Sequence, residues 1–417
     1  MAHLLVIDLP GGNDTDILKA AVDAGHTFTF LTSDLTLYRG QPEVKGYLDQ
    51  AFAQIEVPDF SYGQVEEKIL AIHRQNPLDA LLCLIEIRLI EAARLAQRLK
   101  LHHLNPLSAR LLRDKFDVRL RLSQAGLKQP DFALATTTAE LKQAVNTLGL
   151  PVLIKPADGY GSQNIVVLRT EEDLDPLFSP LEVMLPSHAD YGLGVLANDR
   201  LLVERYMTGD FIGCDTFTVD NEHYLLGVNE KVMFPPPSFA IRGSCFTPRI
   251  AGNSRHQALE EYVFAALDAV GFDQGATHIE LMMTQEGPQL IEINPRLVGA
   301  KIARQVGYAM NRSIHLDLIN LHLGRLTLET LLPPKHQVAV TRWATVQVKG
   351  IIESIQLPAW THPSIVCVDI LKKEGHSVSS PFENADRIGY VVALGQSQPE
   401  AEGLAERYIA ETVVHLR

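Results

Sequence analysis

Carboxylate, amide and guanidinium side chains recur at two-residue spacing in a predicted β-hairpin in the second half of the chain. Glu292, Asn294 and Arg296 alternate along one strand, so their side chains share one face of it. A short turn places Glu280, on the preceding strand, opposite or diagonal to Glu292 on that same face. Facing carboxylates repel each other unless a cation lies between them, and their hard oxygen atoms suit Mg²⁺.

The alternative for this hairpin is a solvated face with ordinary surface charges. Both strands are otherwise strongly apolar, as in a buried sheet, where unpaired carboxylates are costly in free energy. The pattern therefore predicts a metal site made of Glu280, Glu292 and Asn294.

A second group of residues is cationic. Lys155 lies in the apolar strand Pro151–Pro156, and a lysine in a buried strand needs an anion. The polar loop that follows contains glycines, which let backbone N–H groups approach phosphate oxygens. Lys115 lies on the preceding predicted helix and, taken alone, would be a solvated charge. The loop positions of interest are Gly159, Gly161 and Ser162.

The elements that must carry these residues begin with an alternation of strands and helices over residues 1–104. This alternation predicts an open parallel sheet of Rossmann type. Gly11-Gly12 follows the first strand without a complete dinucleotide motif, so a tight turn is the better interpretation. The expected strands are Leu4–Asp8, Thr27–Leu31 and Ala80–Leu84, and the expected helices are Thr15–Ala24, Glu66–Arg74 and Leu89–Leu99.

The remainder of the chain predicts three further units, at 105–200, 201–332 and 333–417. The first has a long helix at Pro106–Ala125 and a small α/β unit around Lys155, the second contains the hairpin, and the third is rich in strands. The other expected helices are Thr138–Leu148, Glu171–Phe178, His256–Val270 and Pro399–Val414. The other expected strands are Asp131–Ala135, Pro151–Pro156, Ile165–Leu168, Leu201–Lys231 with a turn at Asp220-Asn221, Thr277–Thr284 and Gln289–Pro295.

Composition restricts the class of partner. The 417 residues include 37 Lys plus Arg against 50 Asp plus Glu, a net charge of −13, which disfavours nucleic acid and anionic membranes. No uncharged run reaches the length of a membrane span, and the N-terminus lacks the pattern of a signal peptide. Four cysteines without close spacing indicate reduced thiols, so a cytoplasmic protein is expected.

Taken in order, these pieces resemble the ATP-grasp superfamily over nearly the whole chain. Arg113-Asp-Lys115 resembles the first nucleotide lysine, and Lys155 with its loop resembles the second. Leu201–Met207 resembles the hinge strand that holds adenine, and the hairpin resembles the paired metal motif. Asp386–Gly395 resembles the closing strand of the carboxylate–amine ligase branch. The resemblance implies an α/β fold with a Rossmann-like N-terminal domain, a lid and a mixed-sheet core.

The resemblance also implies the ligands. ATP and two Mg²⁺ ions, which Mn²⁺ can replace, are the expected cofactors, with the metal on Glu280, Glu292 and Asn294. The implied ATP-binding residues are Lys115, Lys155, Gly159, Gly161, Ser162, Glu204, Arg205, Met207 and Asp210. Lys155, Glu292 and Arg296 are the implied catalytic residues, with Arg296 steadying an acyl phosphate.

The branch that is most similar contains bacterial L-amino-acid ligases and related amide synthetases. It implies a small-molecule carboxylate and an amine as substrates, with Glu86 near the amine; a merely structural Glu86 is equally compatible. The implied substrate positions are Glu86, Lys231, Arg242, Ser244, Arg296, Gly299 and Ala300. The small residues Gly299 and Ala300 either leave room for a substrate or allow close helix packing.

The chain departs from the branch in one segment. Where relatives carry a glutamate and a histidine, this sequence has Ile241 and Ser244, which puts the amine substrate and any histidine base in question. The expected reaction is ATP-dependent amide formation through an acyl phosphate. Lactam formation within one molecule, a biotin-carboxylase-like activity and a non-catalytic ATP-binding module stay open as alternatives, as does a homodimer.

Overall fold

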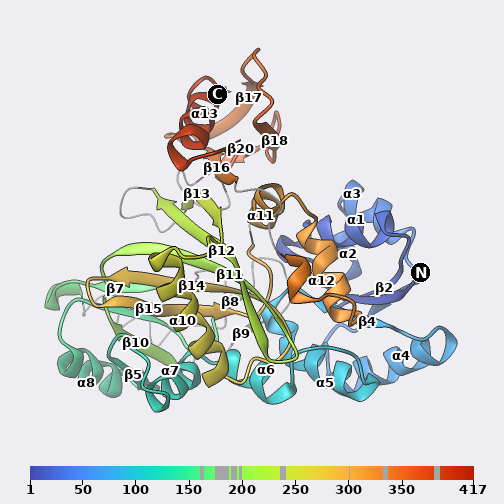
Figure 1. Ribbon diagram of the computed structural model, residues 1–417, viewed down its shortest axis with the longest axis horizontal. Coiled ribbons are helices and arrows are strands. Elements are labelled where there is room, and N and C mark those ends of the chain that lie inside the picture. Colours follow the sequence, from blue (N-terminus) through green and yellow to red (C-terminus); the bar gives the residue numbers. More distant parts are fainter. Residues whose placement is uncertain are drawn as a thin grey trace.

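The computed structural model describes residues 1–159, 164–173, 187–188, 195–196, 200–234, 241–299, 301–331, 337–379 and 386–417. Within these ranges the chain forms a mixed α/β structure with one parallel sheet and several antiparallel ones, which confirms the expected class (Figure 1). No helix among the described residues is long and apolar enough to cross a membrane.

The N-terminal part is a four-stranded parallel sheet in the order β3-β2-β1-β4, as the alternation of strands and helices predicts. The third strand and two of the short helices are absent from the sequence prediction. The strands are β1 (His3–Ile7), β2 (Thr27–Thr32), β3 (Ala53–Glu56) and β4 (Ala80–Cys83). The helices are α1 (Asp16–Asp23), α2 (Leu35–Arg39), α3 (Pro42–Leu48), α4 (Tyr62–Gln75) and α5 (Leu89–Leu99), with 3-10 turns η1 (Pro10–Gly12) and η2 (Glu86–Arg88).

A second sheet, in the order β5-β10-β6-β7, carries Lys155 on β6. Its strands are β5 (Phe132–Ala135), β6 (Val152–Pro156), β7 (Val166–Leu168) and β10 (Leu201–Arg205), and helix α8 (Thr138–Leu148) covers it. The helix predicted at Glu171–Phe178 is instead a 3-10 turn, η3 (Glu171–Asp173), and its remainder lies outside the described residues. The two-residue strands β8 (Ser187–His188) and β9 (Val195–Leu196) pair with each other.

The single helix predicted at Pro106–Ala125 is wrong. The chain forms two helices here, α6 (Pro106–Leu112) and α7 (Lys115–Gln124). Asp114 adopts an extended backbone between them, and its side chain accepts hydrogen bonds from the backbone N–H groups of Phe116 and Asp117. This N-cap starts a new helix at Lys115 and so turns that lysine toward the strands.

The largest element is an eight-stranded antiparallel sheet in the order β15-β14-β11-β12-β13-β16-β20-β18. Asp220 and Asn221 adopt positive φ between β11 and β12 and form the predicted turn. The strands are β11 (Asp210–Val219), β12 (Glu222–Met233), β13 (Ile241–Pro248), β14 (Gly275–Thr284), β15 (Gly287–Asn294), β16 (Val338–Ala344), β18 (Ile365–Ile370) and β20 (Gly389–Gly395).

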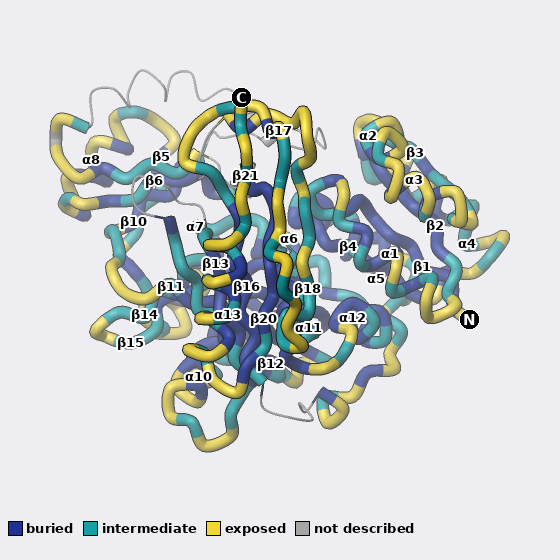
Figure 2. The backbone as a smooth tube through the Cα atoms, turned by 90° about the horizontal axis from the view of Figure 1, so that it is seen from above, coloured by how far each residue is buried: buried dark blue, intermediate teal, exposed yellow. Residues whose placement is uncertain are grey.

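Helices join this sheet to its neighbours. Helix α10 (Ser254–Ala269) packs on β12 and β15, whereas α11 (Ile302–Met310) and α12 (Ile314–His322) lie between the sheet and the N-terminal part (Figure 1). Neither α11 nor α12 is in the sequence prediction. A short turn, η4 (Leu328–Leu331), follows them. Strands β16 and β20 are buried along nearly their whole length (Figure 2).

The C-terminal residues add a small three-stranded sheet, in the order β19-β17-β21, and helix α13 (Gln398–Ala410). The strands are β17 (Gly350–Gln356), β19 (Ser377–Val378) and β21 (Val413–Leu416). The final helix predicted to reach Val414 therefore ends at Ala410. The residues after it form a strand because they pair with β17.

We predict that Gly227→Ala and Gly403→Ala have opposite effects on stability. A Cβ atom at Gly227, in β12, would lie 2.5 Å from a ring carbon of Phe246 and even closer to the backbone of Thr247. We expect this overpacking to lower the free energy of unfolding by about 1–3 kcal/mol. At Gly403, in α13, nothing lies within 4 Å of the added atom, and alanine should raise stability by about 0.5–1 kcal/mol.

Urea unfolding of the two variants and the parent measures this difference. A Gly227→Ala protein as stable as the parent would show that β12 and β13 do not pack at this distance.

Candidate active site

The β14–β15 hairpin has the register that the sequence predicts. Glu280 lies directly opposite Glu292, and His278 lies opposite Asn294. The Asn294 amide Nδ2 donates a hydrogen bond to the carbonyl oxygen of His278, 3.3 Å away, so the amide oxygen is directed elsewhere. Two carboxylates and one amide oxygen therefore converge on one face of the sheet.

Glu280 is held by Lys231 of the strand β12 and by His278 of its own strand. The ammonium of Lys231, on β12, donates to its carboxylate and also lies 4.3 Å from the centre of the Phe211 ring. His278 Nε2 is 3.6 Å from Glu280 Oε1, and His278 Nδ1 is 2.8 Å from Asp215 Oδ1. Burial alone would raise the pKa of Glu280, but Lys231 and His278 outweigh it and hold the pKa well below its usual range.

Glu292 has a different cation. The Lys115 ammonium, at the first position of α7, is 2.8 Å from Glu292 Oε1. The same ammonium donates a hydrogen bond to the carbonyl oxygen of Gly159, at the start of the predicted phosphate loop. Lys115 is therefore no isolated helix charge, because it joins the lid to the hairpin. Each of the two facing carboxylates has its own lysine.

Lys155 has an anion as expected, and the anion is Glu204. Lys155 Nζ is 2.7 Å from Glu204 Oε2, and Arg119 Nε is 2.6 Å from Glu204 Oε1. All three side chains are buried. Burial lowers the pKa of Lys155, although Glu204 opposes this effect. For Glu204, burial acts to raise the pKa, but Arg119 and Lys155 hold it below the usual range.

Arg119 is a site residue that sequence reasoning missed. Its Nη2 donates to the carbonyl oxygen of Ile291 at 3.1 Å, and Lys155 Nζ lies 3.4 Å from the same oxygen. These contacts attach the cluster to β15 beside Glu292. The sequence feature that could have identified Arg119 is its distance from Lys115. The two residues are four apart, so their side chains lie on the same side of a helix.

Arg296 and Glu86 meet although 210 residues separate them. Glu86 Oε1 accepts from Arg296 Nε at 2.6 Å and lies 2.5 Å from Arg296 Nη2. Burial alone would raise the pKa of Glu86, but the guanidinium keeps it below the usual range. The N-terminal part thus contributes a side chain to this region. A Cβ atom at Gly299 would lie 3.6 Å from Arg296 Nη1, so Gly299 lines the same region.

Several other residues predicted to bind substrate or ATP lie away from these clusters, or already form hydrogen bonds or ion pairs within the protein. Ser244 is buried and donates to Gln305 of α11 at 2.6 Å, while Arg242 pairs with Glu406 of α13. Arg205 is exposed beside Asp131, Met207 is half-buried, and Asp210 is exposed 4.0 Å from Arg255. Gly161, Ser162 and Ala300 lie outside the described residues. Among the described side chains, no group of three or more His, Cys, Asp or Glu residues could hold a metal ion.

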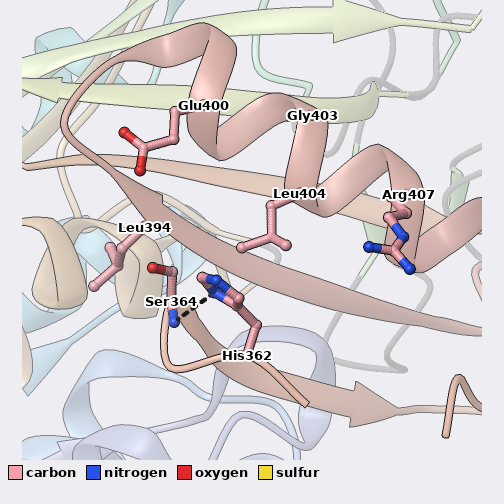
Figure 3. A pocket seen from close by; sticks show the side chains of 7 residues that line it. All are labelled: His362, Ser364, Leu394, Glu400, Gly403, Leu404 and Arg407. Atoms are coloured by element: carbon pink, nitrogen blue, oxygen red, sulfur yellow. Dashed lines mark hydrogen bonds between the residues drawn. The ribbon is translucent and has the colours of Figure 1, made fainter. Parts of the chain in front are cut away.

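A pocket of about 310 Å³ lies apart from these clusters, between β18, β20 and α13 (Figure 3). Its lining has one carboxylate and two basic side chains, and none of the ion-paired residues above belongs to it. The pocket is lined by His362, Ser364, Leu394, Glu400, Gly403, Leu404 and Arg407.

Comparison with known proteins assigns two parts of the chain. Residues 148–304 match the model of the ATP-grasp domain, and residues 342–417 match that of the L-amino acid ligase C-terminal domain 2. The chain is 28% identical over 304 residues to an uncharacterized protein, y4rH, of Sinorhizobium fredii, covering 69% of this chain and 58% of that protein. It therefore spans little more than half the length of that relative.

Two further matches are to ligases. The chain is 23% identical to alanine–anticapsin ligase of Bacillus amyloliquefaciens, covering 74% of this chain and 73% of the ligase. The solved L-amino acid ligase of Bacillus licheniformis superposes with a TM-score of 0.82 at 19% identity, covering 100% and 99% of the two chains. The chain therefore contains an ATP-grasp domain at residues 148–304, followed by an L-amino acid ligase C-terminal domain 2 at residues 342–417.

Proposed function

We propose that this protein is an ATP-dependent ligase that joins a carboxylate to an amine on amino-acid-type substrates. The observation that carries the proposal is the pairing of lysines with the facing carboxylates. Lys115 contacts Glu292 and Lys231 contacts Glu280, and Arg296 lies two residues beyond Asn294, in the bend that follows β15. This is the charge arrangement that a nucleotide triphosphate with its cations requires.

The residues of the hairpin fit Mg²⁺. Magnesium prefers hard oxygen ligands and is usually held by one or two carboxylates together with substrate phosphates. Glu280, Glu292 and Asn294 supply two carboxylates and an amide oxygen on one face. When bound there, the metal would neutralise charge on the transferred phosphoryl group. We extend the proposal to two ions, with Mn²⁺ as a substitute.

The chain's own side chains account for the remaining electrostatics. Lys115 and Lys155, which contact carboxylates in this structure, would turn to the phosphates of ATP. A substrate carboxylate oxygen attacks the γ-phosphorus, the bond to the β-phosphate oxygen breaks, and ADP leaves. Arg296 holds the resulting acyl phosphate, which frees Glu86 to accept hydrogen bonds from the incoming ammonium group.

In the second step the ammonium group gives one proton to solvent water, its nitrogen attacks the carbonyl carbon, and the second proton leaves with the released phosphate. The carbon–oxygen bond to phosphate breaks, and phosphate leaves with that electron pair. Ser244 is buried and hydrogen-bonded to Gln305, so we do not assign it the role of the histidine base that relatives carry at this place. The proposal also includes a cytoplasmic location and a homodimeric assembly.

Phosphate release tests the function directly. The protein is incubated with ATP, Mg²⁺ and amino acids, singly and in pairs, and the products are analysed by mass spectrometry. We expect phosphate release only with a suitable carboxylate, and an amide that contains both partners. Release from a single substrate with loss of water within that molecule would indicate lactam formation, and no substrate-dependent release would contradict the ligase.

We predict that Glu292→Gln lowers turnover at least about 100-fold while the protein stays folded. The other carboxylate on this face, Glu280, is already paired with Lys231, and removing one electrostatic contact to a transition state has this size of effect. The matched control is Glu286→Gln in the exposed turn of the same hairpin, which should keep normal turnover. Near-normal rates for Glu292→Gln at saturating Mg²⁺ would remove Glu292 from the site.

We also predict that Lys155→Met weakens ATP binding more than Lys115→Met does. Lys155 is buried in a strand, and its neighbour Arg119 is held by Glu204 and the carbonyl oxygen of Ile291, whereas Lys115 lies at a helix start near Arg113. Methionine keeps the aliphatic stem of either lysine. Calorimetric titration with ATP gives the two dissociation constants, and unchanged affinity in both variants would exclude a phosphate-binding role.

A further inference from the structure

Arg387 is a buried cation without an acidic partner in the part of the chain that the structure describes. Arg387 is 6% exposed. Its Nη2 donates a hydrogen bond to the carbonyl oxygen of Ile241, 2.7 Å away. Its Nε atom is buried and has no hydrogen-bond partner. Burial lowers the pKa of Arg387 to about 10, so it still carries its charge at neutral pH.

A second buried arginine, Arg342, has a structural role and serves as a comparison for Arg387. Arg342, on β16, is as buried as Arg387, but its Nε is 2.6 Å from Glu406 Oε1 and its Nη2 pairs with Glu402. Both carboxylates come from α13, on the opposite face of the sheet. An unpaired buried charge costs far more than a paired one, so Arg387 needs an anion that these residues do not supply.

Two more buried donors that have no partner among the described residues lie on β16, and one of them, Trp343, is beside Arg387. The Arg387 guanidinium stacks 4.1 Å from the centre of the Trp343 ring. Trp343 Nε1 and Thr341 Oγ1 are both buried and have no hydrogen-bond partner. Since Trp343 and Thr341 are two residues apart on β16, their side chains share one face of the sheet.

That face is the one that carries the candidate active site. Thr341 lies directly opposite Ser244, and Ser244 lies directly opposite Lys231, whose ammonium contacts Glu280. The carbonyl that binds Arg387 belongs to Ile241, three residues before Ser244 on β13, or about 10 Å along the strand. Arg387 Nε, Trp343 Nε1 and Thr341 Oγ1 therefore lie at one end of the sheet face that carries Glu280 and Glu292. That end is the one farther from Arg296.

We propose that Arg387, Trp343 Nε1 and Thr341 form a carboxylate-binding site for a substrate of the ligase. A carboxylate has two acceptor oxygens, and it would accept hydrogen bonds from the unpartnered donors while neutralising the guanidinium. A phosphate group is larger and more strongly charged, and the lysines proposed to bind phosphate, Lys115 and Lys155, lie on α7 and β6. This inference rests on the proposed function for its substrate, but the site itself can be tested without turnover.

The chain contains two tryptophans, which makes the site directly observable. Trp360→Phe leaves Trp343 as the single tryptophan, with its ring centre 4.1 Å from the Arg387 guanidinium. We would titrate this protein, without ATP, with acetate, with L-alanine and with L-alaninamide, whose carboxylate is replaced by a neutral amide. We expect a saturable change in Trp343 emission with the two carboxylates and none with the amide.

Arg387→Met in this background should weaken carboxylate binding at least about tenfold, the size expected for losing hydrogen bonds to a charged group. The matched control is Arg407→Met. In the parent protein Arg407 also stacks on a tryptophan, Trp360, which is phenylalanine in this background, but Arg407 is exposed and paired with Glu411 (Figure 3 shows Arg407 at the edge of the pocket beside α13). The control should bind carboxylates as the parent does.

Stability separates a ligand-binding arginine from a structural one. Because Arg387 has no anion of its own, Arg387→Met should melt at the same temperature as the parent or higher, whereas Arg342→Met should melt lower. If Arg387→Met does not fold, Arg387→Lys, which keeps the charge but removes the Nε–H donor, is titrated instead and should bind carboxylates more weakly. Unchanged carboxylate binding in the variants, an equal response to L-alaninamide, or destabilisation of Arg387→Met to the extent of Arg342→Met would each overturn the site. Failure of amide formation with intact carboxylate binding would contradict only the ligase.

Discussion

Two carboxylates fixed opposite each other across a hairpin are the constraint around which the rest of this structure is arranged. The register of β14 and β15 places Glu280 against Glu292, and neither can move away without breaking the sheet. Their repulsion is relieved by lysines that arrive from different elements, Lys231 from β12 and Lys115 from the start of α7. The break between α6 and α7 at Asp114 is what brings the second lysine there.

Ion pairs also hold the buried charges of the sheet β5-β10-β6-β7, which carries Lys155. Lys155 is placed on a buried strand, and Glu204 on the neighbouring strand lies within ion-pair distance because β6 and β10 are antiparallel partners. Arg119 completes this cluster and binds the backbone of β15. The buried charges Lys155, Glu204 and Arg119 are thus paired in a short chain that crosses from the second sheet to the hairpin.

The sequence predicts the features that depend on local patterns. Alternation and a short turn are sufficient for the hairpin register, and a lysine in an apolar strand is sufficient to demand an anion. It does not identify the anion, since Glu204 lies 49 residues further along the chain, nor Arg119, whose partner is 85 residues away. Arg242 is expected at the substrate but pairs with Glu406, because no local pattern reveals that α13 packs against β13 and β16. The helix break at Asp114 is local, and its N-cap residue was visible in the sequence.

The contact between Glu86 and Arg296 has a consequence for how the parts of the molecule work together. Glu86 lies in the turn η2, which follows strand β4 of the N-terminal sheet, Arg296 lies just after β15, and the two share one ion pair of 2.5 Å. A movement of the N-terminal sheet away from the hairpin would break this ion pair and leave the Arg296 guanidinium without its carboxylate. A displacement in one part of the chain would thereby become an electrostatic change beside Glu280 and Glu292.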